Sequence, residues 1–309
     1  MAADRDPHRL DAMEVRRAFE RAATTYDDAA VLQREIGARM AERLGFVKLD
    51  VSMILDAGCG TGIALGELAA RYPDASVFGV DLAYAMTRAA QKRCASAAPA
   101  ARGLLGRLLG SLAPSPGDAP RLICGDIVHL PLRSGAFDLV WSNLTLQWIN
   151  EPEQAIADVH RVLRVGGLFS FTTFGPDTLK ELRAAFAAAD GAPHVSRFVD
   201  MHDIGDMLVQ AGFADPVMDM ETITLTYADA ASMMHDLKAL GAHNATSGRL
   251  RGLTGRGRWQ RMLTALEANR RDGRLPASFE VVYGHAWKPE PRISADGRAI
   301  VRIERSRKP

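Results

Sequence analysis

The sequence has little cysteine and no long hydrophobic segment. Its three cysteines, Cys59, Cys94 and Cys124, are far apart, and none belongs to a C-x-x-C pair. A disulfide framework or a zinc site is therefore not expected, and we predict that no metal is bound. No apolar run approaches the about 18 residues of a membrane span, and the first residues, MAADRDPHRLDAMEVRR, are too charged for a signal peptide. We expect a soluble, cytoplasmic protein.

The chain also lacks an excess of charge of either sign. Lys and Arg total 38, Asp and Glu total 37, and the formal net charge is +1. A surface that is basic throughout, as in general nucleic-acid-binding proteins, is thereby excluded, although local patches remain allowed. The 309 residues are 47% hydrophobic and 24% charged, which is ordinary for a globular protein. This length suits one large α/β domain with a smaller appendage.

Short apolar runs alternate with segments of helical periodicity along most of the chain. VSMILD ends at a glycine-rich loop, SVFGVD ends at an aspartate, and each is followed by a segment with helical spacing. Strands and helices in alternation predict an α/β protein with a parallel, doubly wound sheet and right-handed crossovers. The expected strands are 51–56, 76–81, 121–126, 137–143, 166–174, 217–227 and 279–288.

Several segments are expected to be appendages of this sheet. Residues 1–46 predict an N-terminal helical lid on a main domain of residues 47–288. Residues 95–120, rich in Ala, Pro, Gly and Ser at their ends, predict a flexible surface insertion, with partner contact as the alternative. Residues 225–275 are expected to form a helical insertion before the last strand that caps the substrate or partner site. The charged tail, 289–309, is expected to be loosely held.

A glycine-rich loop follows the first expected strand. It places Gly58, Gly60 and Gly62 at alternate positions, a G-x-G-x-G spacing that differs from the G-x-G-x-x-G of dinucleotide folds. The loop begins at Asp56, whose negative charge suits a cationic ligand better than a pyrophosphate. Taken alone, the glycines are also compatible with a simple tight turn.

The next three strands also end in residues suited to a nucleoside. Asp81 ends the second strand, where a carboxylate can bind two ribose hydroxyls. Asp126 and Ile127 follow the third, where one can accept from an adenine amino group and the other can cover the ring. SNLTLQW ends the fourth strand at the sheet edge where ligands bind. A nucleoside-containing cation suits all four positions, and S-adenosylmethionine is such a molecule.

This order of motifs resembles the class I S-adenosylmethionine-dependent methyltransferases. The resemblance implies a Rossmann-like sheet of seven strands whose last strand, here FEVVYGHAWK, is antiparallel. It also implies the residues that bind the cofactor, which are Asp56, Gly58, Cys59, Gly60, Gly62, Asp81, Leu82, Asp126, Ile127, Asn143 and Leu144.

A narrower resemblance extends from about residue 15 to residue 288, apart from 95–120. Its most specific patterns are F-x-R-A-A-x-x-Y near the N-terminus and N-L-x-x-Q-W after the fourth strand. With SRFVD, LKALGA and SGR further along, they resemble the malonyl-acyl-carrier-protein O-methyltransferase family of biotin synthesis. The resemblance implies methylation of the free carboxylate of a malonyl thioester on acyl carrier protein. A carboxylate is already ionised at neutral pH, so this reaction needs no general base.

The acceptor carboxylate still needs a cationic partner, for which a bidentate arginine is well suited. Arg197 and Lys238 stand at positions that are cationic in this family, so the resemblance implies a catalytic role for them. His243 and Arg249 lie in segments expected to cover the same site. A solvated surface charge is the alternative for each cation, and a cap or turn residue is the alternative for His243.

Three further residues are expected at the site. Tyr26, in the lid, can hydrogen-bond the methionine carboxylate of the cofactor or the substrate, and we count it among the catalytic candidates. Gln33 can contact the amino-acid end of the cofactor. Trp148 is expected beside the acceptor pocket. Helix packing, a surface position or, for the tryptophan, a place in the core are the structural alternatives.

The stretch RLRGLTGRGRWQRM (249–262) holds five arginines and no acidic residue. We expect it, and Arg256 and Arg258 in particular, to dock the acidic acyl carrier protein. RNA binding and a solvated helix face are the alternatives, and the near-neutral chain with few interleaved aromatics disfavours RNA.

Two other activities fit parts of the sequence. A methyltransferase for a small free carboxylic acid would share every cofactor motif and would not need the arginine stretch. FGPDTLKELR and RLPASFEVVYGHAWK also resemble relatives that assist assembly of respiratory complex I, in which the same fold hydroxylates a protein arginine. Arg197 and Lys238 favour a carboxylate as acceptor, since they would repel a cationic substrate.

Overall fold

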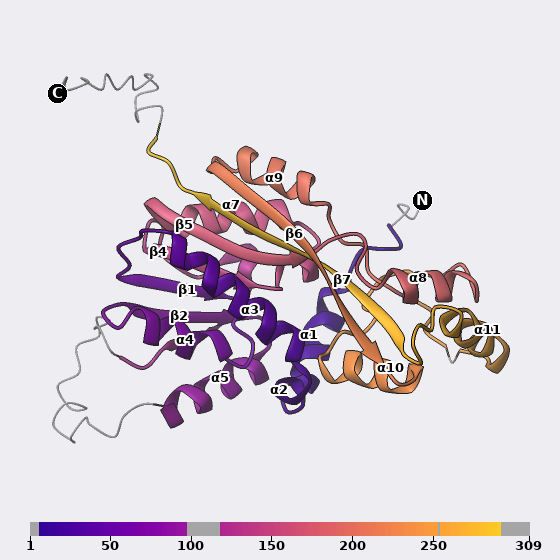
Figure 1. The fold of residues 1–309 in the computed structure, drawn as a ribbon. Helices are drawn as coiled ribbons and strands as arrows, with labels where there is room; N and C mark the ends of the chain where they lie inside the picture. Colours follow the sequence, from indigo (N-terminus) through magenta and orange to yellow (C-terminus); the bar gives the residue numbers. More distant parts are fainter. Residues whose placement is uncertain (1–5, 98–117, 253, 292–309) are drawn as a thin grey trace.

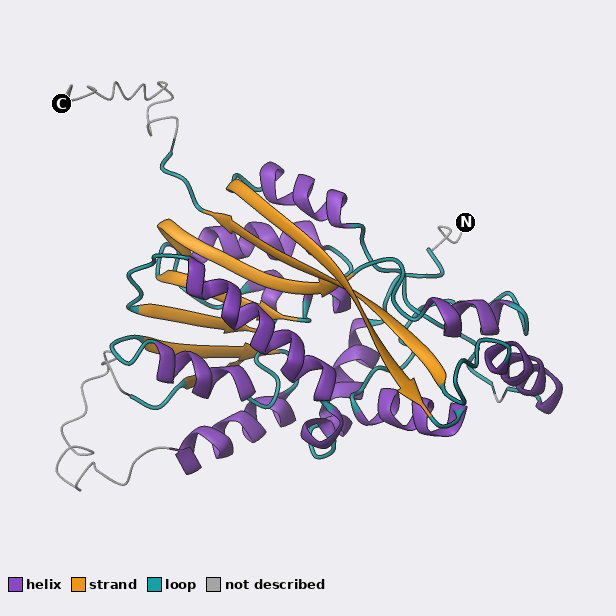
Figure 2. Ribbon diagram, viewed as in Figure 1, coloured by secondary structure: helices purple, strands orange, loops and turns teal. Residues whose placement is uncertain are grey.

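The computed structural model describes residues 6–97, 118–252 and 254–291. Its centre is a sheet of seven strands with helices on both faces (Figures 1 and 2). The strands are β1 (Met53–Ala57), β2 (Ser76–Asp81), β3 (Arg121–Cys124), β4 (Phe137–Asn143), β5 (Leu163–Phe174), β6 (Ala214–Tyr227) and β7 (Leu275–Trp287).

The strand order is β3-β2-β1-β4-β5-β7-β6. Strands β1 to β5 pair in parallel, while β7 is antiparallel to both β5 and β6. The sequence-based prediction of a doubly wound sheet with an antiparallel last strand is therefore confirmed. From β1 the chain first adds β2 and β3 on one side and then adds β4 and β5 on the other side. The carboxyl ends of β1 and β4 therefore lie side by side at the topological switch point, where ligands of such sheets bind.

Alternate residues of the central strands enter two different cores. In β1, Ile54 faces one core and Leu55 the other, and both are fully buried. Helices α3, α4 and α5 cover the first face, and α7 and α9 cover the second. The helices are α1 (Ala12–Ala22), α2 (Tyr26–Ala29), α3 (Val31–Arg43), α4 (Ile63–Arg71), α5 (Tyr84–Ala97), α7 (Pro152–Val162), α8 (Lys180–Ala187), α9 (Met201–Gln210), α10 (Ala230–Ala239) and α11 (Arg256–Glu267). The 3-10 helices are η1 (Leu44–Phe46), η2 (Ile127–His129) and η3 (Leu146–Trp148).

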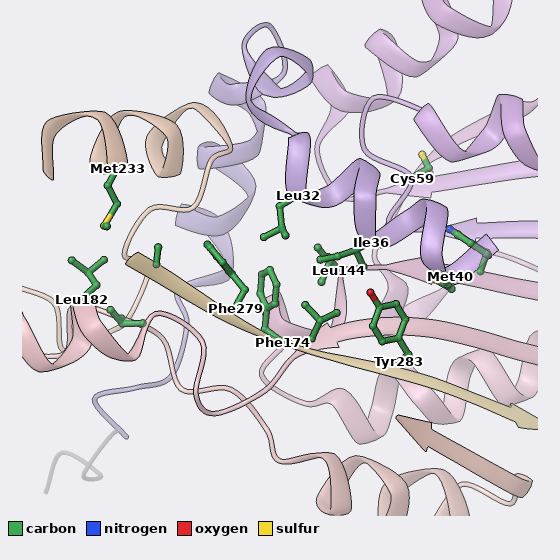
Figure 3. Close-up of a cluster of buried hydrophobic side chains, with 14 of the residues drawn as sticks. Leu32, Ile36, Met40, Cys59, Leu144, Phe174, Leu182, Met233, Phe279 and Tyr283 are labelled. Atoms are coloured by element: carbon green, nitrogen blue, oxygen red, sulfur yellow. The ribbon is translucent and has the colours of Figure 1, made fainter. Parts of the chain in front are cut away.

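The N-terminal segment has two parts with different packing. Leu32, Ile36 and Met40 of α3 are buried in the same core as the sheet, where Figure 3 shows them near Leu144 and Tyr283. Helices α1 and α2 instead lie beside α5 and α10 (Figure 1). The expected lid thus consists of α1 and α2, and α3 is an integral helix of the domain.

Some boundaries differ from the sequence-based expectation because the backbone turns where periodicity alone predicts a helix. The segment PDTLKELRAAFAAAD (176–190) has helical spacing from its first residue, yet α8 begins only at Lys180, because Leu179 adopts a left-handed conformation with φ 54°. The segment between β6 and β7 contains α10 and α11. The 95–120 insertion and the tail after residue 291 lie almost entirely outside the described residues. Within the described part, no helix is long and apolar enough to cross a membrane.

Candidate active site

A cavity of about 310 Å³ lies at the carboxyl ends of β1, β2 and β4. Helices α1, α2 and α3 contribute to one side of its wall, and α8, α10 and the loops that follow them contribute to another. Most of the predicted site residues meet in this wall. They are Tyr26, Gln33, Gly58, Gly60, Asp81, Leu82, Asp126, Ile127, Asn143, Leu144, Trp148 and His243.

The glycine loop needs glycine for two different reasons. Gly58 has φ 87°, and a Cβ there would lie 2.0 Å from Oγ1 of Thr145, so the β4 end touches this backbone directly. Gly60 has φ 52°, and a Cβ on it would meet no atom within 4 Å, so its backbone borders open space in the cavity wall. The amides of Gly58 and Cys59 both donate to the Val80 carbonyl, at 2.8 and 3.0 Å, which fixes the loop to β2.

Other loop residues lie behind this wall. The Cys59 side chain is buried against Gly79 of β2, and burial raises the pKa of its thiol. Gly62, with φ 80°, begins α4, and a Cβ there would lie 2.8 Å from Cβ of Ala90 in α5. Cys59 and Gly62 therefore shape the loop through packing and not as part of the cavity wall.

Two buried carboxyl groups lie close to each other under the loop. Asp81 accepts from Gly60 N at 2.9 Å and from Ala83 N at 2.8 Å, yet burial raises its pKa to about 6. Asp56 is only 2% exposed, and its Oδ2 has no hydrogen-bond partner. Burial and the nearby Asp81 charge raise the pKa of Asp56 to about 8. Both groups gain from a positive charge placed near them.

Asn143 joins the end of β4 to α3. Its Nδ2 donates to the Gln33 carbonyl at 3.0 Å, and its Oδ1 accepts from the Thr172 hydroxyl at 2.7 Å. The same hydroxyl oxygen accepts from the amide of Leu144, which has φ 52°. The Gln33 side chain lines the cavity with a buried Oε1 that has no partner. Such an acceptor suits an N–H group on a ligand, since burying it unpaired is costly.

The lid is held down by two acidic residues. Glu20 of α1 accepts from Tyr84 N and Ala85 N, at 2.7 and 2.8 Å, and so caps the start of α5. Asp27 of α2 accepts from the Thr61 hydroxyl at 2.5 Å and pairs with Arg93 of α5. These contacts place Tyr26 in the cavity wall, where burial followed by the Asp81 charge raises its pKa.

The end of the cavity away from the glycine loop is largely apolar. The hydrophobic residues there are Phe174, Leu179, Leu182, Phe198, Leu225, Tyr227, Leu237 and Phe279. Phe19 of the lid meets Trp148 edge to face, with ring centroids 5.1 Å apart, at the side of this region. Gln147, Ser196, His194 and Asn244 supply its polar groups. An acyl chain with one polar end fits such a lining better than a compact polyanion does.

The predicted arginines and lysine lie outside this wall. Arg197 is exposed and borders a second, smaller cavity of about 30 Å³, which shares Gln147 and Phe198 with the main one. Lys238 is exposed on α10. Arg249 donates to the Thr246 carbonyl at 3.0 Å and lies 3.9 Å from Glu14, so it ties α1 to a neighbouring loop.

Arg256 and Arg258 are exposed in the first turn of α11. Helix α11 lies beside α8 at one end of the molecule (Figure 1). The prediction that these arginines face a partner is compatible with this exposure.

In the described chain, the main cavity wall contains four carboxylates and neither Lys nor Arg. The carboxylates are Asp81, Asp126, Glu151 and Asp236. With the unpaired oxygen of Gln33 in it, and the buried carboxyl group of Asp56 outside it, this wall suits a cationic ligand that carries N–H and O–H donors. The residues present therefore fit S-adenosylmethionine.

Sequence reasoning missed several polar residues of the wall, and three of them are instructive. Thr145 and Gln147 belong to the N-L-x-x-Q-W pattern, and their place at a strand end was the available signal. His194 lies in the irregular loop between α8 and α9, where no periodicity or motif singles it out.

Comparisons with known proteins agree with this geometry. A family model described as a methyltransferase domain matches residues 55–171. The crystal structure of the YcgJ protein from Bacillus subtilis superposes with a TM-score of 0.52 at 16% identity, covering 82% of this chain and 98% of that one. This similarity shows the fold, which is that of the class I methyltransferases.

Sequence similarity to curated proteins is much higher. The malonyl-[acyl-carrier protein] O-methyltransferase of Laribacter hongkongensis is 54% identical over 94% of this chain and 95% of its own. The protein of the same name from Nitrosospira multiformis is 54% identical over 93% of this chain and 92% of its own. With this identity along nearly the whole length of both relatives, the chain belongs to the malonyl-[acyl-carrier protein] O-methyltransferase family.

Proposed function

We propose that this protein transfers a methyl group from S-adenosylmethionine to the free carboxylate of a malonyl group held as a thioester on acyl carrier protein. The product is the malonyl methyl ester that begins the pimeloyl chain of biotin. One observation carries the proposal: an acid-lined nucleoside site and an apolar acyl site form one continuous cavity. The names of relatives that are 54% identical support the same reaction.

The cofactor half of the cavity is assigned as follows. Asp81 binds the ribose hydroxyls, and its two backbone hydrogen bonds orient the carboxylate for this task. Asp126 accepts from Val128 N at 2.9 Å and sits beside Ile127, so that the pair receives the adenine. Gln33 lines the amino-acid end, and Asp56 is buried close to Asp81 outside the wall, so a positive charge at that end stabilises both unpaired oxygens.

The residues present need only align the reactants and exclude water. When bound, the cofactor supplies a methyl group on a positively charged sulfur; a carboxylate oxygen bonds to that carbon as the carbon–sulfur bond breaks. Tyr26 and Trp148 close the cavity from the lid side and the β4 side. Tyr26 keeps its proton, because burial raises its pKa, and it therefore donates a hydrogen bond.

We assign two roles to the exposed cationic side chains around the site: binding the carrier protein and guiding its acyl group into the cavity. Arg256 and Arg258 attract the acidic carrier, and Arg249 fixes the loop at Thr246 to the N-terminal segment. Arg197, which borders the second cavity, and Lys238 on α10 are exposed, and both are assigned to guiding the malonyl carboxylate.

The test is direct methylation. Purified protein is incubated with S-adenosylmethionine and malonyl-acyl carrier protein, and the mass of the carrier is followed. We expect a gain of one CH₂, sensitive to alkaline hydrolysis, and none with acetyl-acyl carrier protein, which lacks the free carboxylate. If the cofactor binds but the carrier gains no mass while a free dicarboxylic acid is methylated, the acceptor proposed here is wrong.

A further inference from the structure

An anionic acceptor poses an electrostatic problem for this cavity. Its wall, within the described residues, carries four carboxylates, and only two side chains, His194 and His243, can become cations. The predicted Arg197 and Lys238 lie outside the wall. Among the described side chains of this wall, only these two histidines can offer a malonyl carboxylate a positive charge.

His194 has the geometry of a fixed, charge-supported histidine. Its Nε2 lies 2.8 Å from Oδ1 of Asp190, and the two side chains are 12% and 14% exposed. The ring stacks on Phe186, with centroids 4.0 Å apart and planes 8° from parallel. The carboxylate holds the Nε2 proton and leaves Nδ1 as the second nitrogen of a ring that lines the cavity. Nδ1 makes no hydrogen bond with any described residue.

The loop that carries this pair is held from both sides. Oδ1 of Asp190 also accepts from Ala192 N at 3.0 Å, which fixes the carboxylate. Asn244 donates to the Pro193 carbonyl at 2.7 Å, directly before the histidine. From α11, Arg261 donates to the Ala189 carbonyl at 2.8 Å. The imidazole is therefore positioned by neighbouring segments before any substrate enters.

We propose that His194, in its protonated form, receives the acceptor carboxylate through Nδ1–H, and that Asp190 is the positioning residue that keeps the ring oriented and charged. The inference rests on the proposed function and names the partner of its acceptor. When Nε2 donates to Asp190, a neutral ring has only a lone pair at Nδ1, which repels an anion. Protonation turns Nδ1 into a cationic donor, so carboxylate binding and ring charge favour each other.

His243 is less suited to this task. Burial, with the positive charges of Arg21 and Lys238, lowers its pKa, and no acidic side chain in the described chain hydrogen-bonds to it. Three charged groups lie around His194. Asp190 contacts the ring, Arg258 of α11 interacts electrostatically with Asp190, and Asp236 lines the same cavity as His194. Asp190 is the only one of these within hydrogen-bonding distance of the ring.

Steady-state kinetics with the intact enzyme test the pair. His194→Gln removes the cation, and we expect kcat/KM for malonyl-acyl carrier protein to fall about 10- to 100-fold, the range for a lost hydrogen bond to a charged group. The dissociation constant of the cofactor should stay within about twofold of the wild-type value. In the wild type, KM should rise as the pH increases and the ring loses its proton. Asp190→Asn should move that rise to lower pH, and His194→Gln should abolish it.

His160→Gln is the matched control, because His160 also packs against a phenylalanine, Phe213, but on the opposite face of the sheet. It should leave the pH profile unchanged. An unchanged pH profile in His194→Gln, or an equal loss of cofactor affinity and turnover, would overturn the inference.

A binding measurement separates this inference from the proposed function. With S-adenosylhomocysteine bound, malonate is titrated while the ring resonances of His194 are followed by NMR at several pH values. We expect the ring to hold its proton to higher pH with malonate present, an effect absent in Asp190→Asn. If the protein methylates no malonyl carrier yet shows this response, the anion site stands and the acceptor is wrong. Methylation with no response of the ring refutes the role of His194.

Discussion

Asp56 allows a test of how a buried carboxyl group at the cofactor site changes the stability of the fold with pH. The carboxyl group is 2% exposed, one oxygen is unpaired, and burial together with the Asp81 charge raises its pKa to about 8. The unfolded chain releases this proton near pH 4, whereas the folded protein keeps it almost to pH 8. Because the folded state binds the extra proton, its stability falls as the pH rises between those values. Asp56→Asn keeps the shape and removes the titration.

The size of the effect follows from the two pKa values. A pKa of about 8 in the folded state implies a loss of about 2 kcal/mol in the free energy of unfolding between pH 6 and pH 8. Asp81, with a pKa of about 6, adds only about 0.4 kcal/mol over the same interval. Total stability is typically about 5–15 kcal/mol, so a difference of this size is measurable as a change of about 4 °C in Tm.

Urea unfolding of wild type and Asp56→Asn at pH 6, 7 and 8 gives the comparison, since other titrating groups are shared and cancel. We expect the variant to gain stability relative to wild type as the pH rises. Its affinity for S-adenosylmethionine should fall at least about tenfold at pH 8, because the variant lacks the negative charge that attracts the cation. Equal pH dependence of the two proteins would refute the buried, unpaired state of Asp56. Stability that changes as expected with unchanged affinity would refute only its role toward the cofactor.

Three further perturbations follow from the site. Asp27→Ala removes the Thr61 hydrogen bond and the Arg93 ion pair that hold the lid. Stopped-flow measurement should then show cofactor release that is about tenfold faster. The control Asp177→Ala breaks an exposed ion pair with Lys180 and should leave the release rate unchanged. Arg197→Ala should lower turnover with cofactor affinity unchanged, and equal losses of both would indicate a folding role. Reversing the charge of Arg256 and Arg258 together should raise KM for malonyl-acyl carrier protein about tenfold at low salt, with malonyl-coenzyme A unaffected and the difference shrinking at high salt.

The sheet could be predicted from sequence because its signals are local. Apolar runs such as 51–56 and 76–81 are buried on both faces, so their composition alone marks them as central strands. The two long antiparallel strands are also marked by their composition. By contrast, the division between lid and domain depends on tertiary packing. The periodicity of residues 11–46 gives no sign that α3 joins the main core while α1 and α2 cover the cavity.

The cofactor wall was predictable for a related reason: many of its residues stand at the ends of strands. Asp81, Asp126 and Asn143 follow apolar runs, and the carboxyl ends of parallel strands meet at one edge. Cys59 and Gly62 share the motif yet lie behind the wall, because the Cys59 side chain packs against β2 and Gly62 begins α4 against Ala90. A motif thus identifies the loop without telling which of its side chains reach the ligand.

The acceptor side resisted prediction because the residue types that sequence reasoning favours are unsuited to this wall. An arginine or lysine in the cavity would be attracted to Asp81, Asp126 and the other carboxylates, and would oppose the cationic cofactor. A histidine reduces both problems, since its ring can be neutral near neutral pH and an anion or a carboxylate beside it favours the charged form. A cavity that must hold a cationic donor and an anionic acceptor together therefore favours a side chain that becomes charged when the acceptor binds. The His194–Asp190 pair provides such a side chain, from a loop that has no sequence motif.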